Sequence, residues 1–246
     1  RSPFWSSLMI VSFLAGVAMP TGAAEITSSA KQAHITDFLS GKVLFSKNAD
    51  EPMKPASMAK IMTVFVAFQR IVDGSLKMDD EFVVSTKAWK KGGSKMFLRE
   101  GESVKIKDLI KGVIIQSGND ACIVLAEGLA GTEENFAELM TIRAKEIGLT
   151  NSNFKNSTGW PDPDHKMSSR DLVTLATKIR EKYPSYYKIF NDLEFTWDGI
   201  SQTNRNPLLS MNLGADGLKT GYTDEAGYGL IASAKQDERR ITFVIT

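Results

Sequence analysis

The sequence has few of the residues that cross-link small folds or bind metals. Cys122 is the only cysteine, so no internal disulfide can form and the hydrophobic core must hold the fold together. We expect Cys122 itself to be a packed small side chain. His34 and His165 are the only histidines and lie in no cluster with ligand spacing, so we expect both in loops or on the surface. The sequence therefore predicts no metal site and no cofactor.

A strong charge of one sign is also missing. Lysine and arginine number 30 and aspartate and glutamate 29, which gives a formal net charge of +1. A domain that binds nucleic acid usually carries a broad positive field, so we expect no nucleic-acid partner. Apolar residues make up 42% of the 246 residues, which suits one domain of moderate size or two small ones.

The apolar run from Phe4 to Ala18 is shorter than the about 20 residues of a bilayer span. It follows an arginine and precedes the small residues G-A-A, which is the pattern of a signal peptide. We expect residues 1–24 to be that peptide and residues 25–246 to be one domain; an N-terminal membrane anchor is the alternative. Because the chain starts without Met and stops within the strand pattern I-T-F-V-I-T, we expect this domain to be C-terminally incomplete.

Hydrophobic periodicity predicts strands at both ends of the chain and helices between them. Two short apolar runs flank Ser40-Gly41, which is the pattern of a β-hairpin, and two more strands are expected at 229–234 and 240–245. Helical spacing covers residues 57–72, 104–115, 120–129, 133–147 and 168–182. This order favours an α/β (α+β) domain in which an antiparallel sheet is built from both chain ends, with a helical insertion.

The pattern S-x-x-K occurs four times, at Ser28, Ser57, Ser152 and Ser185, but only Ser57 opens a long apolar helix. The first turn of a helix has unpaired N–H groups and a positive dipole end, which suit a developing oxyanion. Residues three apart share a helix face, so Lys60 can reach the Ser57 hydroxyl, and burial can lower its pKa enough for it to act as a base. The alternative is an ordinary helix start with a surface lysine.

Two further motifs follow in the chain. S-G-N-D at Ser117 to Asp120 places a hydroxyl and an amide two residues apart between helices, although a capped helix start would look the same. K-T-G at Lys219 to Gly221 occurs once; on a strand it would present Lys219 and Gly221 on one face and Thr220 on the other. A turn with a solvated lysine is the alternative.

The order S-x-x-K, S-x-N, K-T-G is the motif set of penicillin-binding proteins and related β-lactamases. The stretches P-A-S-M-A-K-I-M-T, S-G-N-D-A, N-R-N-P-L-L and D-G-L-K-T-G-Y-T closely resemble the low-molecular-mass penicillin-binding proteins that are serine-type D-alanyl-D-alanine carboxypeptidases. The resemblance runs from about Lys31 to Thr246 and implies a β-lactamase/transpeptidase-like fold. Tyr222 departs from it, because members of the family often have His after K-T-G.

The resemblance implies a role for each catalytic motif. Ser57 would attack the carbonyl of the D-Ala-D-Ala bond, and Lys60 would take its proton. Ser117 would relay a proton to the leaving D-alanine, and Asn119 would hold the substrate amide. Lys219 would lower the pKa of Lys60 by repulsion and attract the anionic substrate.

The resemblance also implies a substrate-binding set. Thr220 and Arg205 are expected to grip the terminal carboxylate, since a guanidinium binds carboxylates bidentately. The backbone N–H groups of Ser57 and Tyr222 would form the oxyanion hole. Gly221 would let the substrate backbone lie close against the strand. For Arg205, a loop salt bridge is the alternative.

The implied partners are peptidoglycan stem peptides ending in D-Ala-D-Ala, with β-lactams as covalent inhibitors of an exported enzyme in the periplasm or on the outer face of the cytoplasmic membrane. Many relatives continue into an amphipathic anchor helix, which would add a membrane surface as a partner. No glutamate after Asn119 has asparagine four residues later, which disfavours a class A β-lactamase. A D,D-endopeptidase and a non-catalytic penicillin sensor or scaffold remain as alternatives.

Overall fold

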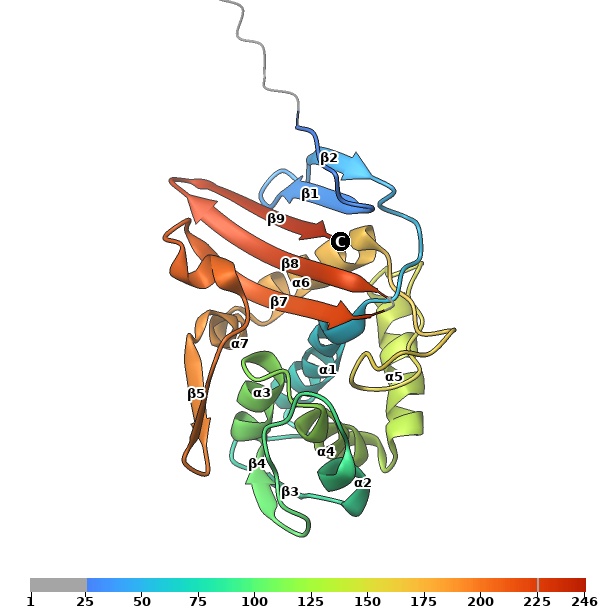
Figure 1. Cartoon of the computed structure of the whole chain (residues 1–246), viewed down its shortest axis with the longest axis vertical. Coiled ribbons are helices and arrows are strands. Elements are labelled where there is room, and N and C mark those ends of the chain that lie inside the picture. Colours follow the sequence, from blue (N-terminus) through green and yellow to red (C-terminus); the bar gives the residue numbers. More distant parts are fainter. Residues whose placement is uncertain (1–25, 225) are drawn as a thin grey trace, which may run out of the picture.

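The computed structural model describes residues 26–224 and 226–246, so the expected signal peptide lies outside the described residues. Five antiparallel strands form the main sheet in the order β2-β1-β9-β8-β7 (Figure 1). They are β1 (Ala33–Asp37), β2 (Val43–Lys47), β7 (Ala215–Thr223), β8 (Gly227–Gln236) and β9 (Arg239–Ile245). The first strand pairs directly with the last, Ile35 opposite Phe243. The predicted sheet from both chain ends is confirmed.

Helix α1 (Lys60–Val72) is the central helix of the molecule, preceded by the 3-10 turn η1 (Ala56–Ala59). Its residues from Lys60 to Phe68 are all buried, because other helices pack around it. Ala56 has a φ of 49°, a left-handed conformation that costs a non-glycine residue roughly 1 kcal/mol or more. This strained residue directly precedes Ser57 in the η1 turn.

The other helices form the insertion, as predicted. They are α2 (Thr86–Lys90), α3 (Ile106–Ile114), α4 (Asn119–Ala130), α5 (Glu133–Glu146), α6 (Ser169–Lys182) and α7 (Pro184–Tyr187), with 3-10 turns η2 (Lys188–Asn191) and η3 (Pro207–Ser210). The helix expected from Val104 begins at Ile106, because β4 (Ser103–Lys105) pairs with β3 (Glu81–Val83). A second short hairpin joins β5 (Glu194–Trp197) to β6 (Ile200–Thr203). Side-chain oxygens of Thr132 and Ser168 cap α5 and α6.

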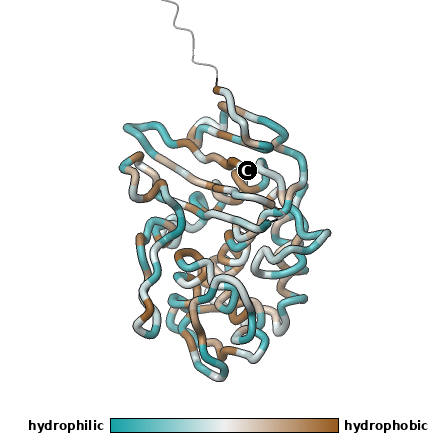
Figure 2. Tube along the Cα trace, in the orientation of Figure 1, coloured by the Kyte–Doolittle hydropathy of each residue, from teal (hydrophilic) through white to brown (hydrophobic). Residues whose placement is uncertain are grey.

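Helices and sheet share one core. Helix α6 packs on β1 and β9, and η1 packs on β7 and β8. Apolar segments occur both in the sheet and in the helices behind and below it (Figure 2). Within the described ranges, every helix is too short or too polar to cross a bilayer.

His34 differs from expectation, whereas His165 lies in a loop as expected but is buried. His34 lies on β1 and His165 lies in the segment before α6, and each is only 2% exposed. His34 is enclosed because β1 is an inner strand of the sheet. The ring of His165 packs edge-on against Phe154, so it is part of the interior. Neither belongs to a cluster of three or more metal-ligating side chains within the described residues.

Candidate active site

Ser57 and Lys60 face each other at the start of α1. Lys60 is 1% exposed, and its Nζ lies 2.8 Å from Ser57 Oγ and 2.7 Å from the carbonyl oxygen of Thr158. The η1 turn brings the two side chains together, because residues three apart lie on the same face. The arrangement provides a hydroxyl with a lysine nitrogen at hydrogen-bonding distance.

The other S-x-x-K serines lack this arrangement. Ser152 Oγ donates to Asp171 Oδ2 at 2.7 Å, and Ser28 Oγ accepts from the Ala30 N–H. Ser185 is exposed in the single turn of α7. Among the S-x-x-K serines, all of which the structure describes, the lysine three residues on is bonded only to Ser57.

Ser117 and Asn119 lie at the junction between α3 and α4. Ser117 has a φ of 58°, and its buried Oγ has no hydrogen-bond partner within the described residues. Asn119 Nδ2 donates to the Gly92 carbonyl at 2.9 Å, and its backbone N–H donates to the Ser94 carbonyl at 2.8 Å. A buried hydroxyl without a partner in a strained backbone position is a typical feature of a functional site.

Asp120 fixes the neighbouring segment, a role that sequence reasoning missed. Its carboxylate accepts from the backbone N–H groups of Met96, Phe97 and Leu98 at 2.8–3.2 Å. Ser94 lies on the same segment, which connects α2 to β4. The acidic residue after S-G-N was a possible signal, but its partners are backbone groups more than twenty positions away.

Strand β7 carries the K-T-G motif along the edge of the sheet. Lys219 is 2% exposed, Thr220 is half-buried and Tyr222 is 51% exposed. The structure also shows a packing role for Gly221 that the sequence does not predict. A Cβ there would lie 3.0 Å from the Pro55 carbonyl oxygen and 3.2 Å from Ala56 Cβ, so glycine lets β7 pack against the Ser57 turn.

Arg205 reaches across from the loop after β6. Its Nη1 donates to Ser94 Oγ at 2.6 Å, so it connects this loop to the segment between α2 and β4. Within the described residues it forms no ion pair with a carboxylate, which disfavours the alternative of a loop salt bridge. Its guanidinium is a positive charge near Lys60 and Lys219.

Burial controls the ionisation of both lysines. Burial is the largest cause of a pKa of about 8 for Lys60; the charges of Arg205 and Lys91 add to this lowering, whereas Cys122 and Asp120 on α4 oppose it. The pKa of Lys219 lies well below its ordinary value because of burial, with repulsion from Lys60 and Arg205 as further causes. The sequence predicts Lys219 as the cation that tunes Lys60; in the structure, burial is the largest cause, Arg205 and Lys91 add to it, and Lys60 and Lys219 repel each other.

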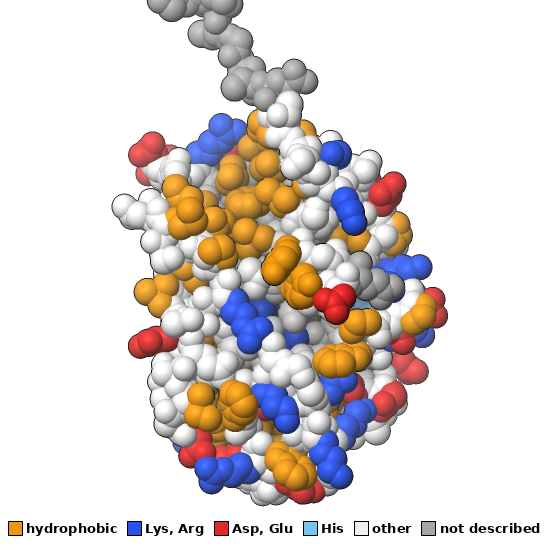
Figure 3. Space-filling view, in the orientation of Figure 1, with side chains coloured by type: hydrophobic (Ala, Val, Ile, Leu, Met, Phe, Trp, Pro, Cys, Tyr) orange, Lys and Arg blue, Asp and Glu red, His pale blue; other side chains and the backbone are white. Residues whose placement is uncertain are grey.

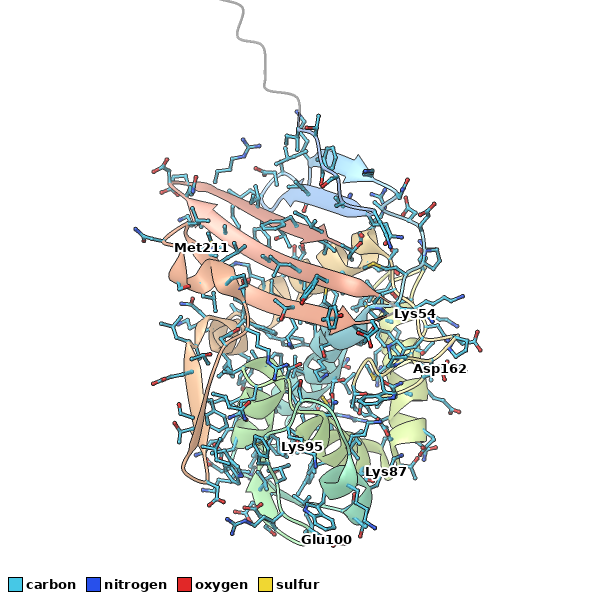
Figure 4. All side chains as sticks on the ribbon, viewed as in Figure 1. Lys54, Lys87, Lys95, Glu100, Asp162 and Met211 are labelled. Atoms are coloured by element: carbon cyan, nitrogen blue, oxygen red, sulfur yellow. The ribbon has the colours of Figure 1, made fainter. Side chains whose placement is uncertain are left out.

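A cleft of about 380 Å³ opens beside Ser57. Residues of five segments line it: Ser57, Gly93, Ser94, Asn119, Thr158, Gly159, Trp160, Pro161, Tyr222, Thr223 and Asp224. Basic side chains gather near the middle of this face, below the apolar outer face of the sheet (Figure 3). In Figure 4, Lys95 lies over the helices below β7, while Lys54 and Asp162 lie beside the C-terminal end of that strand.

The wall of this cleft includes Thr158, Gly159 and Trp160, which belong to the segment 156–160, which we call the cleft segment. Gly159 has a φ of 79°, and a Cβ there would lie 1.8 Å from the Ala56 carbonyl oxygen. Only glycine therefore lets this segment press against the Ser57 turn. Trp160 is half-exposed at the rim, with Lys91 Nζ 4.1 Å from its ring centroid.

Cys122 is not a second nucleophile. It is fully buried on α4, as expected, and burial raises the pKa of its thiol to about 12. At neutral pH it is therefore a protonated, packed side chain.

The fold is that of the β-lactamases and penicillin-binding D,D-peptidases. The D-alanyl-D-alanine carboxypeptidase family matches residues 19–246, and the chain belongs to this family. D-alanyl-D-alanine carboxypeptidase DacC of Escherichia coli is 45% identical over 218 residues, which cover 86% of this chain and 54% of that protein. The crystal structure of penicillin binding protein 5 from Haemophilus influenzae has a TM-score of 0.88 at 36% identity, with 92% of this chain and 67% of that chain covered.

A D-alanyl-D-alanine endopeptidase of Pseudomonas aeruginosa is a more distant relative. It is 26% identical over 87% of this chain and 69% of that protein. The chain spans about half the length of the curated carboxypeptidases that it matches, 54% in the case of DacC.

Proposed function

We propose that the chain is the catalytic part of a serine D-alanyl-D-alanine carboxypeptidase, which removes the terminal D-alanine from peptidoglycan stem pentapeptides through an acyl-enzyme on Ser57. The observation that carries the proposal is the 2.8 Å contact between Ser57 Oγ and the buried Nζ of Lys60. Membership of the D-alanyl-D-alanine carboxypeptidase family supports the choice of substrate.

In the acylation step, Ser57 Oγ attacks the carbonyl carbon between the two D-alanines, and its proton passes to neutral Lys60 Nζ. The backbone N–H groups of Ser57 and Tyr222 stabilise the oxyanion, at about 3 to 4 kcal/mol per donor. The C–N bond then breaks, and the proton reaches the leaving amine through Ser117 Oγ. Free D-alanine and an ester on Ser57 result.

In the deacylation step, water attacks the ester carbon, and its proton returns Ser57 to the hydroxyl form through Lys60. Asn119 holds the peptide amide in place. The buried Lys219, with Arg205 nearby, makes the site attractive to anions, and Thr220 and Arg205 bind the terminal carboxylate. Gly221 keeps β7 close to the Ser57 turn.

The same nucleophile opens the ring of β-lactams and is acylated by them. The name of the penicillin-binding relative supports this part of the proposal.

Because the substrate lies outside the cytoplasm, the proposal includes export, with residues 1–24 as signal peptide and 25–246 as the catalytic domain. The choice between the periplasm and the outer face of the cytoplasmic membrane, and any contact with a membrane surface, rest on the family resemblance alone.

Mass spectrometry of products tests the proposal. A synthetic pentapeptide ending in D-Ala-D-Ala should lose one D-alanine, and Ser57→Ala should abolish this loss. Ser185→Ala is the matched control, because it removes an exposed serine of another S-x-x-K and should keep wild-type activity. Preferential cutting of a cross-linked peptide dimer would instead identify an endopeptidase. Acylation by penicillin without any D-alanine release would identify a sensor.

A further inference from the structure

Asn156 organises the cleft segment with a single side chain. Its Oδ1 accepts four hydrogen bonds, from the N–H and Oγ1 of Thr158 at 3.1 Å, from Gly159 N–H at 2.8 Å and from Trp160 N–H at 3.1 Å. Its Nδ2 donates to the Trp160 carbonyl at 3.0 Å. The carboxamide therefore fixes the path of the backbone from Thr158 to Trp160.

The fixed segment ends in a contact with the general base. The Thr158 carbonyl oxygen lies 2.7 Å from Lys60 Nζ, and Gly159 packs against the Ala56 carbonyl. A second anchor holds the same segment from behind, where Ser157 O accepts from Thr63 Oγ1 at 2.6 Å. Small movements of this backbone would therefore change the position of the Thr158 carbonyl relative to Lys60.

The hydrogen-bonding groups of a neutral amine indicate what the contact between Thr158 and Lys60 does. Lysine in its basic form has two N–H donors and one lone pair, whereas a carbonyl oxygen can only accept. The Thr158 carbonyl must therefore take an N–H of Lys60. With that bond fixed, the lone pair can be turned toward the Ser57 hydroxyl 2.8 Å away, which is the orientation that proton transfer needs.

We infer that Asn156 is a positioning residue for acylation: by holding the Thr158 carbonyl against Lys60, it orients the Lys60 lone pair toward Ser57. The inference rests on the proposed function, in which Lys60 takes the Ser57 proton. Asn156 acts through Thr158 and Lys60 and touches no reacting atom.

The sign of the expected pH effect follows from the bond. An ammonium is a stronger donor than an amine, so the Thr158 carbonyl favours the charged form of Lys60 and opposes the effect of burial. Loosening the carbonyl should lower the pKa of Lys60, and a negative charge at position 156 should raise it. The other ionisable groups that act on Lys60 are unchanged by either substitution; they are Lys91, Asp120, Cys122, His165, Arg205 and Lys219.

The test measures the rate constant for acylation by a labelled penicillin as a function of pH, beside D-alanine release. Asn156→Ala should slow acylation by about tenfold to a hundredfold and move the acid limb of the profile to lower pH. Asn156→Asp keeps the accepting oxygen and adds a charge, so its acid limb should move to higher pH. Asn153→Ala is the control, because that carboxamide holds the same region through Asp164 O without reaching Lys60.

An unchanged acid limb in both Asn156 variants would overturn the inference, even if the rates fell. The inference would also be overturned if the slower acylation of Asn156→Ala were explained entirely by a smaller fraction of protein that can be labelled at Ser57. The same holds if the control Asn153→Ala behaved like Asn156→Ala. If Asn156→Ala fails to fold, the direction of the shift in Asn156→Asp decides. Penicillin acylation needs no peptide substrate, so a wild type that acylates without releasing D-alanine would overturn the proposed function separately.

Discussion

At the scale of single residues, Lys60 is the unusual group of the site. A solvated lysine is almost wholly protonated at neutral pH and cannot act as a base. Burial of Lys60 lowers its pKa to about 8, within reach of physiological conditions. The same burial places its nitrogen against Ser57 and Thr158, so position and basicity have one structural cause.

The pH profile of the wild type tests this account of Lys60. Because the base must be neutral, kcat/KM should rise with pH through an apparent pKa of about 8 and fall again when a second group loses its proton. D-alanine release and penicillin acylation should share the acid limb, since both begin with the same proton transfer. A limb near ~10.4, the ordinary lysine value, would show that burial does not tune the base.

Arg205 offers a second prediction at this scale. Arg205→Ala should raise KM for a peptide with a free terminal carboxylate by roughly tenfold or more, and much less for its C-terminal amide, which has no charge to bind. Ser94→Ala is the matched control, because it removes the partner of Arg205 and keeps the guanidinium. Equal losses of Arg205→Ala on both peptides would assign Arg205 to loop structure.

At the scale of elements, the site depends on segments held by side-chain to backbone bonds. Asp120 at the start of α4 fixes residues 96–98, and Asn156 fixes residues 158–160. Neither segment is a helix or a strand, so the backbone groups have no ladder to satisfy them. These two side chains replace the backbone hydrogen bonds of secondary structure in segments that lie at or next to the cleft.

The substitution Asp120→Ala tests how much the bonds to residues 96–98 contribute to stability. It leaves several N–H groups without their acceptor, and Met96 N–H and Leu98 N–H are buried, so the free energy of unfolding should fall by about 2 to 3 kcal/mol in a denaturant titration. Asp120→Asn keeps one accepting oxygen and should lose less. A loss below about 0.5 kcal/mol for Asp120→Ala would mean that the segment is held by its packing alone.

The sequence predicts the long elements and misses the short ones for a physical reason. The strands near both chain ends and helices such as α1 and α6 carry regular periods of apolar residues over many positions. The hairpins β3–β4 and β5–β6 have three or four residues per strand, too few for a period to be distinguished. The roles of Asp120 and Asn156 depend on which backbone N–H groups their side chains meet, and the spacing of residues in the chain does not identify those groups.

For the motif residues too, one part of the site can be predicted from the sequence and another part cannot. S-x-x-K, S-x-N and K-T-G come from three distant parts of the chain, yet their order alone indicates one site. The burial of Lys219 and the packing of Gly221 against Ala56 depend on how β7 meets η1, and no local spacing encodes that contact.

At the scale of the whole molecule, His165 couples stability to pH. Burial lowers the pKa of His165 from 6.5 to about 4. Between these values the unfolded chain binds the proton and the folded chain does not, so the free energy of unfolding should fall as pH decreases through this window. One pKa unit corresponds to about 1.4 kcal/mol, which gives up to about 3 kcal/mol.

The comparison with a variant isolates this contribution from that of the carboxyl groups. His165→Asn retains a polar side chain that does not titrate, so its stability should depend less on pH between 6.5 and about 4 than that of the wild type. Denaturant unfolding at both ends of the window provides the measurement. Parallel losses in the two proteins would show that His165 does not titrate abnormally.

The cleft itself is a property of the whole molecule, because α1, the α3–α4 junction and β7 each contribute one motif. The most direct test of the central claim is to locate the acylated residue by peptide mapping after reaction with a labelled penicillin. The account predicts label on Ser57 alone, since it combines a helix start, a buried lysine and the cleft. Label on Ser28, Ser152 or Ser185, or a Ser57→Ala variant that is still labelled, would contradict it.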